Sequence, residues 1–221
     1  MIGEIVECRA CPRLVEWREK VAREKRAAFA TEDYWGRPVP PFGDPSARLL
    51  VVGLAPAAHG GNRTGRIFTG DRSGEWLFAS MYRTGFSNQP HSVSRDDGLR
   101  LIDAYVTAPV RCAPPANKPT LEERDRCIGY LVRELQILTE VSVIVCLGSF
   151  AWDSSLTAMR LHGENVPRPK PRFGHLAEAE VGGYVLVGSY HPSQQNTFTG
   201  KLTTDMLDAV FLRVRALIAE L

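Results

Sequence analysis

The sequence predicts an α/β fold, a single three-layer α/β/α domain over residues 1–221 with a central, mostly parallel, four-stranded sheet. Three observations support this prediction. Short apolar runs typical of buried strands alternate along the chain with longer helix-forming segments. The 221 residues suffice for one sizeable domain. The chain also contains no internal repeat, low-complexity run or clear linker that would divide it.

The four expected strands are apolar runs without internal breaks. The first, Ala47–Leu54, follows a Pro/Gly-rich loop over residues 34–45. The others are expected at residues 102–108, 141–147 and 184–187. Parallel strands connected by helices place the loops after their carboxyl ends at one edge of the sheet, where such folds bind ligands. The loops 54–71, 108–120 and 188–199 are therefore the expected site.

The expected helices are marked by composition and by capping residues. Ser73 is a candidate N-cap for a helix to Arg83, and Thr120 with Glu123 forms a capping box at the start of a helix reaching about residue 140. The remaining helices are expected over residues 10–30, after Gly148-Ser149, and over residues 202–221.

Composition is that of a soluble globular protein, with 44% hydrophobic and 24% charged residues. No apolar run is long enough to span a membrane, and the N-terminus lacks the pattern of a signal peptide, so we expect a cytoplasmic protein without a membrane partner. The net charge of +2 provides no global basic field, although one face could still be basic.

Five cysteines in a cytosolic chain are poor candidates for disulfides. Cys8 and Cys11 form a C-x2-C pair, which suits a metal, and the distant Cys112 and Cys127 could complete four ligands. Spacing alone separates neither zinc from iron–sulfur nor ligands from incidental thiols. Cys146 lies within an apolar run and is interpreted as a core residue.

Two of the loops have features that indicate a binding site. The first, GLAPAAHGGNRTGRIFTGD over residues 53–71, follows a strand with glycines and small residues, which is typical of a backbone cradle for a polar or anionic ligand. It matches neither a Walker motif nor a dinucleotide fingerprint. In the other loop, His191 follows a strand and precedes Pro192, a good position for chemistry, although an isolated histidine is more often a surface residue.

Together, GLAPAAHGGNRTGRIFTGD, VRCAPPANKPT and HPSQQNTFTG resemble the uracil-DNA glycosylase superfamily, specifically family 5, from Cys8 to about Thr203. The resemblance implies an enzyme of base excision repair that flips uracil out of double-stranded DNA and hydrolyses its N-glycosidic bond. It also implies a [4Fe–4S] cluster bound by Cys8, Cys11, Cys112 and Cys127.

The resemblance further implies roles for individual residues. Backbone groups of Gly53, Leu54, Ala55, Pro56 and Ala57 would hold the flipped base. Phe68 would stack on the base, and His191 would donate to the base oxygen on which negative charge develops. Gln194, Gln195 and Asn196 would fill the gap left in the duplex.

Some positions depart from related families. Small or apolar residues, Ala55, Pro56 and Ala57, stand where other families carry a water-activating side chain, and Ala108 stands where family 4 has a uracil-pairing Asn. We therefore expect a pocket that also accepts hypoxanthine or xanthine. Asn117 would then hold the water, and Asp71 is the nearest carboxylate candidate.

For DNA contacts we expect Arg63, Arg66, Arg72 and Lys201, with Arg168, Lys170 and Arg172 as a second basic group. The alternative for each is a solvated surface charge. We expect no lysine placed to form a Schiff base, because prolines flank Lys118, and hence a monofunctional enzyme. The resemblance and the size of the chain imply a monomer.

Two other functions are compatible with parts of this pattern. A non-catalytic iron–sulfur electron carrier or DNA-binding redox protein would explain the cysteines, but not the His-Pro-Ser loop beside a glycine-rich cradle. A small-nucleotide hydrolase or nucleosidase would act on free deoxyuridine and would not depend on the arginines.

Overall fold

The computed structural model describes residues 1–220. Its six strands are β1 Phe42–Gly43, β2 Leu49–Val52, β3 Ala104–Thr107, β4 Val143–Leu147, β5 Glu178–Val181 and β6 Tyr184–Ser189. The α-helices are α1 Ile2–Val6, α2 Pro12–Glu24, α3 Gly61–Thr64, α4 Arg72–Arg83, α5 Leu121–Ile137, α6 Ser149–His162, α7 Gln194–Phe198 and α8 Thr204–Glu220. Two 3₁₀ turns, η1 Ala27–Phe29 and η2 Pro115–Asn117, complete the elements.

The strands form one sheet in the order β1-β3-β2-β4-β6-β5. The central strands β3, β2, β4 and β6 are parallel, which confirms the predicted four-stranded core of the sheet. The antiparallel edge strands β1 and β5 were not predicted. β1 is only two residues long, and β5 has the half-exposed sequence EAEV, so neither contains the apolar run that marks a buried strand.

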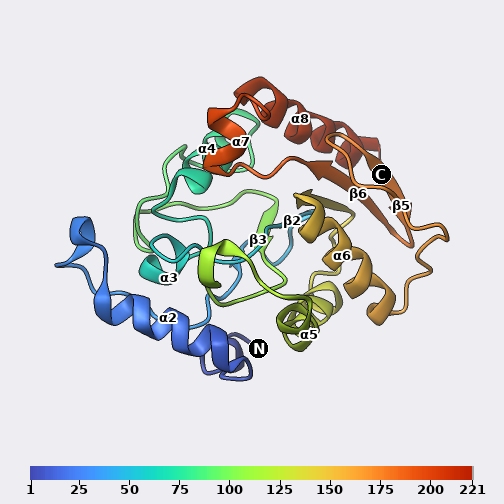
Figure 1. Ribbon diagram of the computed structural model, residues 1–221. Coiled ribbons are helices and arrows are strands. Elements are labelled where there is room, and N and C mark those ends of the chain that lie inside the picture. Colours follow the sequence, from blue (N-terminus) through green and yellow to red (C-terminus); the bar gives the residue numbers. More distant parts are fainter. Residues whose placement is uncertain (221) are drawn as a thin grey trace.

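Helices cover both faces of the sheet (Figure 1). α4 and α8 pack together on one face, with Leu77, Phe78 and Phe211 in a fully buried core. α5 and α6 pack on the other face, where Trp152 is fully buried. Burial of both faces explains why β2, β3 and β4 are apolar at nearly every position rather than alternating.

The helix ends follow local capping chemistry. The predicted capping box at Thr120 and Glu123 is present and starts α5. The prediction of Ser73 as an N-cap is wrong. Asp71 caps α4 instead, because its carboxylate accepts from the backbone N–H of Gly74. The closing helix starts at Thr204, and the loop expected after residue 188 contains the short helix α7.

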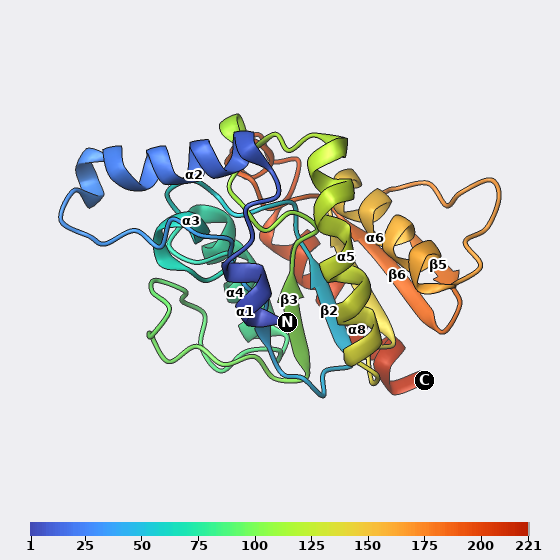
Figure 2. The same cartoon turned by 90° about the horizontal axis from the view of Figure 1, so that it is seen from below.

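The N-terminal segment lies outside the three layers. α2 begins with Pro12 at its first turn and ends at Glu24, because Lys25 has a φ of 53°. This helix packs beside α3, a short helix within the first predicted loop (Figure 2). Within residues 1–220, no helix is both long and apolar enough to cross a membrane.

Candidate active site

A cleft of about 880 Å³ lies at the carboxyl edge of the sheet. Its walls come from the loops after β2, β3 and β6, as the parallel topology predicts, and from the segment that follows α2. The three residues expected to take part in catalysis, His191, Asn117 and Asp71, all line this cleft. The parallel topology of the sheet therefore brings together, in one cleft, side chains that are far apart in the sequence.

His191 stands two residues beyond the end of β6. Its backbone carbonyl accepts a hydrogen bond from the side-chain amide of Asn196 over 2.8 Å, which fixes the turn that carries it. Burial lowers the pKa of His191 to about 4. The imidazole is therefore neutral at physiological pH and can donate one hydrogen bond into the cleft without carrying a charge.

The ring of Phe68 faces the ring of His191, with 6.0 Å between centroids and a tilt of 34°. Phe68 is buried and has a φ of 52°, a left-handed conformation that is uncommon for a bulky residue. A Cβ atom on Gly53 would lie 2.7 Å from two carbons of the Phe68 ring. Gly53 therefore permits the ring to lie directly against the end of β2.

The carboxylate of Asp71 is largely enclosed. One oxygen accepts from the N–H of Gly74 over 3.0 Å, and the other lies where a side chain of Gly60 would otherwise project. Burial raises the pKa of Asp71. The residue thus combines a structural role at the start of α4 with a position in the cleft wall.

Asn117 ends the turn η2 on the opposite wall, and the adjacent Ala116 also lines the cleft. Both have positive φ angles, 54° for Asn117 and 53° for Ala116. Asn117 is exposed, so its amide is available to a water molecule or a ligand. Lys118 also lines the cleft, which corrects the expectation that the flanking prolines direct it away from the site.

The residues expected to hold the base divide into two groups. Leu54, Ala55 and Ala57 line the cleft. Pro56 and Ala108 are buried behind it, Pro56 against Gly61 and Ala108 in the core beneath α4 and α8.

The four cysteines of the predicted ligand set, Cys8, Cys11, Cys112 and Cys127, line one common cavity apart from this cleft. Burial raises the pKa of Cys112 to about 11 and that of Cys127 to about 12. Within residues 1–220, no group of three or more His, Cys, Asp or Glu side chains has the arrangement that would hold a single metal ion. Cys146 is buried in β4, as expected for a core residue.

Comparison with known proteins matches residues 40–215 to the uracil DNA glycosylase superfamily. The chain belongs to this superfamily. The type-5 uracil-DNA glycosylase of Mycobacterium bovis is 56% identical over 212 residues, covering 95% of this chain and 78% of that protein. The type-5 protein of Thermus thermophilus is 49% identical over 217 residues, covering 98% and 96%. A type-4 protein of Archaeoglobus fulgidus is 32% identical over 158 residues, 70% of each chain. The resemblance to family 5 is thus confirmed.

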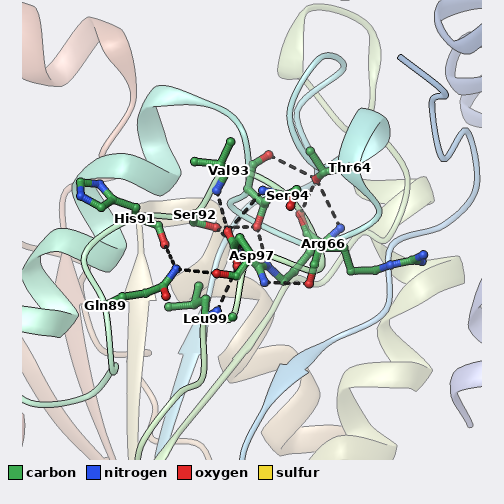
Figure 3. Close-up of polar contacts among 12 residues, drawn as sticks. Thr64, Arg66, Gln89, His91, Ser92, Val93, Ser94, Asp97 and Leu99 are labelled. Atoms are coloured by element: carbon green, nitrogen blue, oxygen red, sulfur yellow. Dashed lines mark hydrogen bonds and ion pairs between the residues drawn. The ribbon is translucent and has the colours of Figure 1, made fainter.

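In this member of the uracil-DNA glycosylase superfamily, two of the predicted DNA-contacting arginines are internal. Arg66 is only 3% exposed and forms an ion pair with Asp97, in which its Nη2 lies 2.7 and 2.8 Å from the two carboxylate oxygens (Figure 3). It also bonds Thr69 and Ser92. Because this guanidinium is enclosed and neutralised, the prediction that Arg66 contacts DNA is wrong. Its network instead braces the loop that carries Phe68.

The prediction that Arg63 contacts DNA is corrected for the same reason. It is 8% exposed, pairs with Glu32, and donates to the carbonyls of His59 and Gly70 over 2.8 and 2.9 Å. Its guanidinium also lies 3.9 Å from the centre of the Phe29 ring. A side chain with these partners holds the glycine-rich loop together and does not face a DNA phosphate.

The other predicted DNA-contacting residues lie at the surface. Arg72, Gln194 and Gln195 line the cleft, and Arg72 stacks over Phe198 at 4.4 Å. Lys201 is exposed with its ammonium 4.9 Å from the Tyr190 ring. In the second basic group, Arg168, Lys170 and Arg172 are all exposed, and Lys170 pairs with Asp153 over 2.7 Å.

Sequence reasoning assigned no role to three further residues of the cleft wall, Arg26, Phe29 and His59. His59 lies within the glycine-rich motif, which was a usable signal. Arg26 and Phe29 follow α2, about 25 residues before the first motif, and tertiary contacts, such as the packing of α2 beside α3 and of Phe29 on Arg63, bring them to the cleft.

Proposed function

We propose that this protein is a DNA glycosylase that removes uracil from double-stranded DNA in base excision repair and leaves an abasic site. The observation that carries the proposal is the neutral imidazole of His191 facing Phe68 in a cleft at the carboxyl edge of the sheet. The relatives named type-5 uracil-DNA glycosylase, which align over nearly the whole chain, support it. An extruded base would stack on Phe68 and meet the N–H of His191.

His191 would stabilise the leaving group. When the glycosidic bond breaks, its electrons move onto the base and negative charge develops on a ring oxygen. A preorganised donor facing that oxygen typically contributes about 3–4 kcal/mol to the stability of the transition state. A neutral imidazole supplies this hydrogen bond and need not transfer its proton. His191 is therefore assigned the largest catalytic contribution.

The attack of water on the sugar requires less catalytic assistance from the protein than the departure of the base does. The oxocarbenium-like sugar that remains after bond cleavage reacts even with weakly activated water, and Ala55 and Ala57 have no group that could activate one. The exposed amide of Asn117 would position the water. Asp71 is the carboxylate of the cleft wall with a raised pKa, and it would accept the released proton.

A broad base specificity follows from the small side chains of the wall. Leu54, Ala55 and Ala57 offer no side-chain hydrogen bond that would select uracil, and Ala108 is buried behind them. A wall of small apolar side chains has no hydrogen-bonding group that a different base would leave unpaired, so it discriminates between bases weakly. We therefore propose that hypoxanthine and xanthine are also removed.

We propose that the enzyme does not cleave the DNA strand, and the environment of Lys118 supports this. A lysine that forms a Schiff base is activated by desolvation or by a neighbouring cation. Lys118 lines the cleft but is exposed, so its ammonium keeps its hydration. The product would be an intact strand with an abasic site.

Cys8, Cys11, Cys112 and Cys127 would hold a [4Fe–4S] cluster. The four thiols line one common cavity, and a cluster of this type takes one cysteine on each iron. Arg18 provides a second argument: it is 2% exposed, forms no ion pair among residues 1–220, and donates to the sulfur of Cys112 over 3.0 Å. A buried cation needs a negative partner, and iron-bound thiolates would supply it.

The cluster would be structural. Its ligands come from the segment before α2, from the end of the loop after β3, and from α5, so it would crosslink the N-terminal segment to the sheet. A non-catalytic redox protein would share the cysteines, but it would not require His191 facing Phe68, and we do not favour it. We further propose that the enzyme works in the cytoplasm as a monomer.

The proposal is tested by incubating the protein with labelled duplexes carrying one U·G, hypoxanthine or xanthine site, followed by alkali. Cleavage that depends on alkali is expected for all three, together with no trapped covalent complex under borohydride. Cleavage without alkali would contradict the monofunctional mechanism. Activity on free deoxyuridine in place of DNA would favour the nucleosidase. No cleavage of any duplex by iron-loaded protein would overturn the enzymatic function.

A further inference from the structure

One end of the cleft contains three side chains that the proposed chemistry does not use, Arg26, Phe29 and His59. They come from two segments, the turn after α2 and the loop between β2 and α3. These segments are held together by the packing of α2 against α3 (Figure 2). The question is what this end of the cleft can bind.

His59 is fixed from two sides. Its carbonyl accepts from Nε of Arg63 over 2.8 Å, and its ring Nδ1 lies 2.9 Å from the hydroxyl of Tyr34. The two rings meet edge to face, with centroids 6.0 Å apart. The imidazole therefore has a defined orientation before any ligand arrives.

The hydrogen bonds of Tyr34 favour one tautomer of the neutral His59 ring. The backbone N–H of Arg26 donates to the Tyr34 hydroxyl oxygen over 3.4 Å, and the hydroxyl hydrogen can then be donated to Nδ1 of His59. With Nδ1 as an acceptor, the neutral ring has its hydrogen on Nε2. His59 thus presents an N–H donor at its free edge.

The charge around His59 favours an anion. Arg26 is exposed and forms no ion pair with any residue from 1 to 220, whereas the nearby Arg63 is neutralised by Glu32. Desolvation, with Arg26 and Arg63 nearby, lowers the pKa of His59, so the ring stays neutral. Of the acidic residues of the cleft wall, Glu75 lies in the first turn of α4, and the carboxylate of Asp71 lies against Gly60 and accepts from the backbone N–H of Gly74. A neutral donor beside a free guanidinium suits a phosphate oxygen.

We infer that His59 and Arg26 form a binding site for a backbone phosphate of the DNA strand that carries the flipped nucleotide, with Tyr34 as the residue that positions His59. The inference rests on the proposed action on DNA. A flipped nucleotide stays joined to a phosphate on each side, and these phosphates must pass the mouth of the cleft. The base itself is assigned to Phe68 and His191, so the end at His59 remains for the backbone.

The test measures binding and chemistry separately. Affinity is determined for a duplex with a tetrahydrofuran abasic site, which needs no catalysis, at several chloride concentrations. The single-turnover rate at saturating enzyme is determined on a U·G duplex. The variants are Arg26→Gln, His59→Ala, His59→Gln and Tyr34→Phe. The control is Arg23→Gln, because Arg23 is an exposed arginine of α2 that does not line the cleft.

Arg26→Gln is expected to weaken binding about 5- to 20-fold and to reduce the slope of log affinity against log salt by about 0.9, the loss of one phosphate contact. His59→Ala should weaken binding about 10- to 100-fold, the size of one hydrogen bond to a charged group. His59→Gln, which keeps a donor, should recover part of this loss. Tyr34→Phe should weaken binding less than His59→Ala does. The single-turnover rates of all four variants at saturating enzyme should equal that of the wild-type protein.

Affinities and salt slopes of Arg26→Gln and His59→Ala that match Arg23→Gln would overturn the inference. A His59→Ala protein with normal affinity and a reduced saturating rate would also overturn it, because His59 would then act on the chemistry. Failure of the wild-type protein to excise uracil would count against the proposed function alone. The abasic-site duplex would still decide whether these residues contact phosphate.

Discussion

The ring of Phe68 lies against Gly53 so closely that a methyl group on Gly53 would overlap two ring carbons, at 2.7 Å. This contact links the end of β2 to the surface on which the flipped base would stack. The conformation of Phe68, with its positive φ, is held from the other side by the network of Arg66 and Asp97. The base-stacking surface is therefore built from the backbone of a strand and a braced loop.

Gly53→Ala is expected to displace Phe68 and to lower the single-turnover excision rate by about 10- to 100-fold, because small displacements of positioned groups have effects of that size. Gly129→Ala is the matched control, since a Cβ on Gly129 in α5 meets no atom within 4 Å. Gly129→Ala should leave the rate unchanged and stabilise its helix by about 0.5–1 kcal/mol. Equal rates for the two variants would show that Phe68 does not need its present position.

Substitutions of Arg66 and Arg72 are expected to have different effects, the first on stability and the second on DNA binding. Arg66→Met removes the cationic partner of the half-buried Asp97, which keeps its backbone N–H donors, and should lower the free energy of unfolding by about 1.5–3 kcal/mol. Arg72→Gln should leave stability nearly unchanged and weaken DNA binding, with a salt slope reduced by about 0.9. Urea unfolding and binding titrations check both. A stable Arg66→Met protein with weakened, less salt-dependent binding would restore Arg66 as a DNA contact.

His191 makes stability depend on pH in a defined direction. Its pKa is about 4 in the folded protein against 6.5 for an unperturbed histidine, so the unfolded state binds the proton more readily. The stabilising effect of a neutral His191 is fully present above about pH 6.5. It is lost progressively as the pH falls toward 4.

Unfolding free energies measured from pH 7.5 to 4.5 should therefore fall less steeply for His191→Gln than for the wild-type protein. Parallel curves for the two proteins would mean that His191 titrates normally in the folded state. The neutral imidazole in the proposed mechanism would then be wrong.

The cysteine site is tested by metal content. Cys112→Ser and Arg18→Met should each reduce bound iron and visible absorbance and lower the melting temperature, because the first removes a ligand and the second the buried counter-charge. Cys146→Ala, which alters a buried cysteine in β4, should retain its iron. Purified wild-type protein containing zinc without iron would contradict the cluster while leaving the four ligands in place.

Sequence patterns predicted the parts of the fold that depend on local physics. The central strands are apolar because both faces are buried, and the α5 capping box is complete within four residues. The edge strand β5 was not predicted because it has no apolar run, and its pairing with β6 defines it. The helix α7 was not predicted because it has only five residues and no apolar period, and its local signal is the Ser193 N-cap.

The site was predictable where function depends on position after a strand, as for His191 and the loop after β2. The site was not predictable where the tertiary environment of a side chain determines its role. Arg63, Arg66 and Arg72 look alike in the sequence, yet the first two are enclosed by Glu32 and Asp97, and only Arg72 lines the cleft. Arg26 was missed because its place beside His59 arises from tertiary packing alone.

The central claim is that a neutral His191 stabilises the charge on the departing base. The most direct measurement is the single-turnover rate of uracil excision by His191→Ala at saturating enzyme, together with its affinity for an abasic-site duplex. We predict a rate about 100- to 1,000-fold below that of the wild-type protein, with affinity within a few-fold. A rate close to that of the wild-type protein, at equal affinity, would contradict the account and place the catalytic donor elsewhere in the cleft.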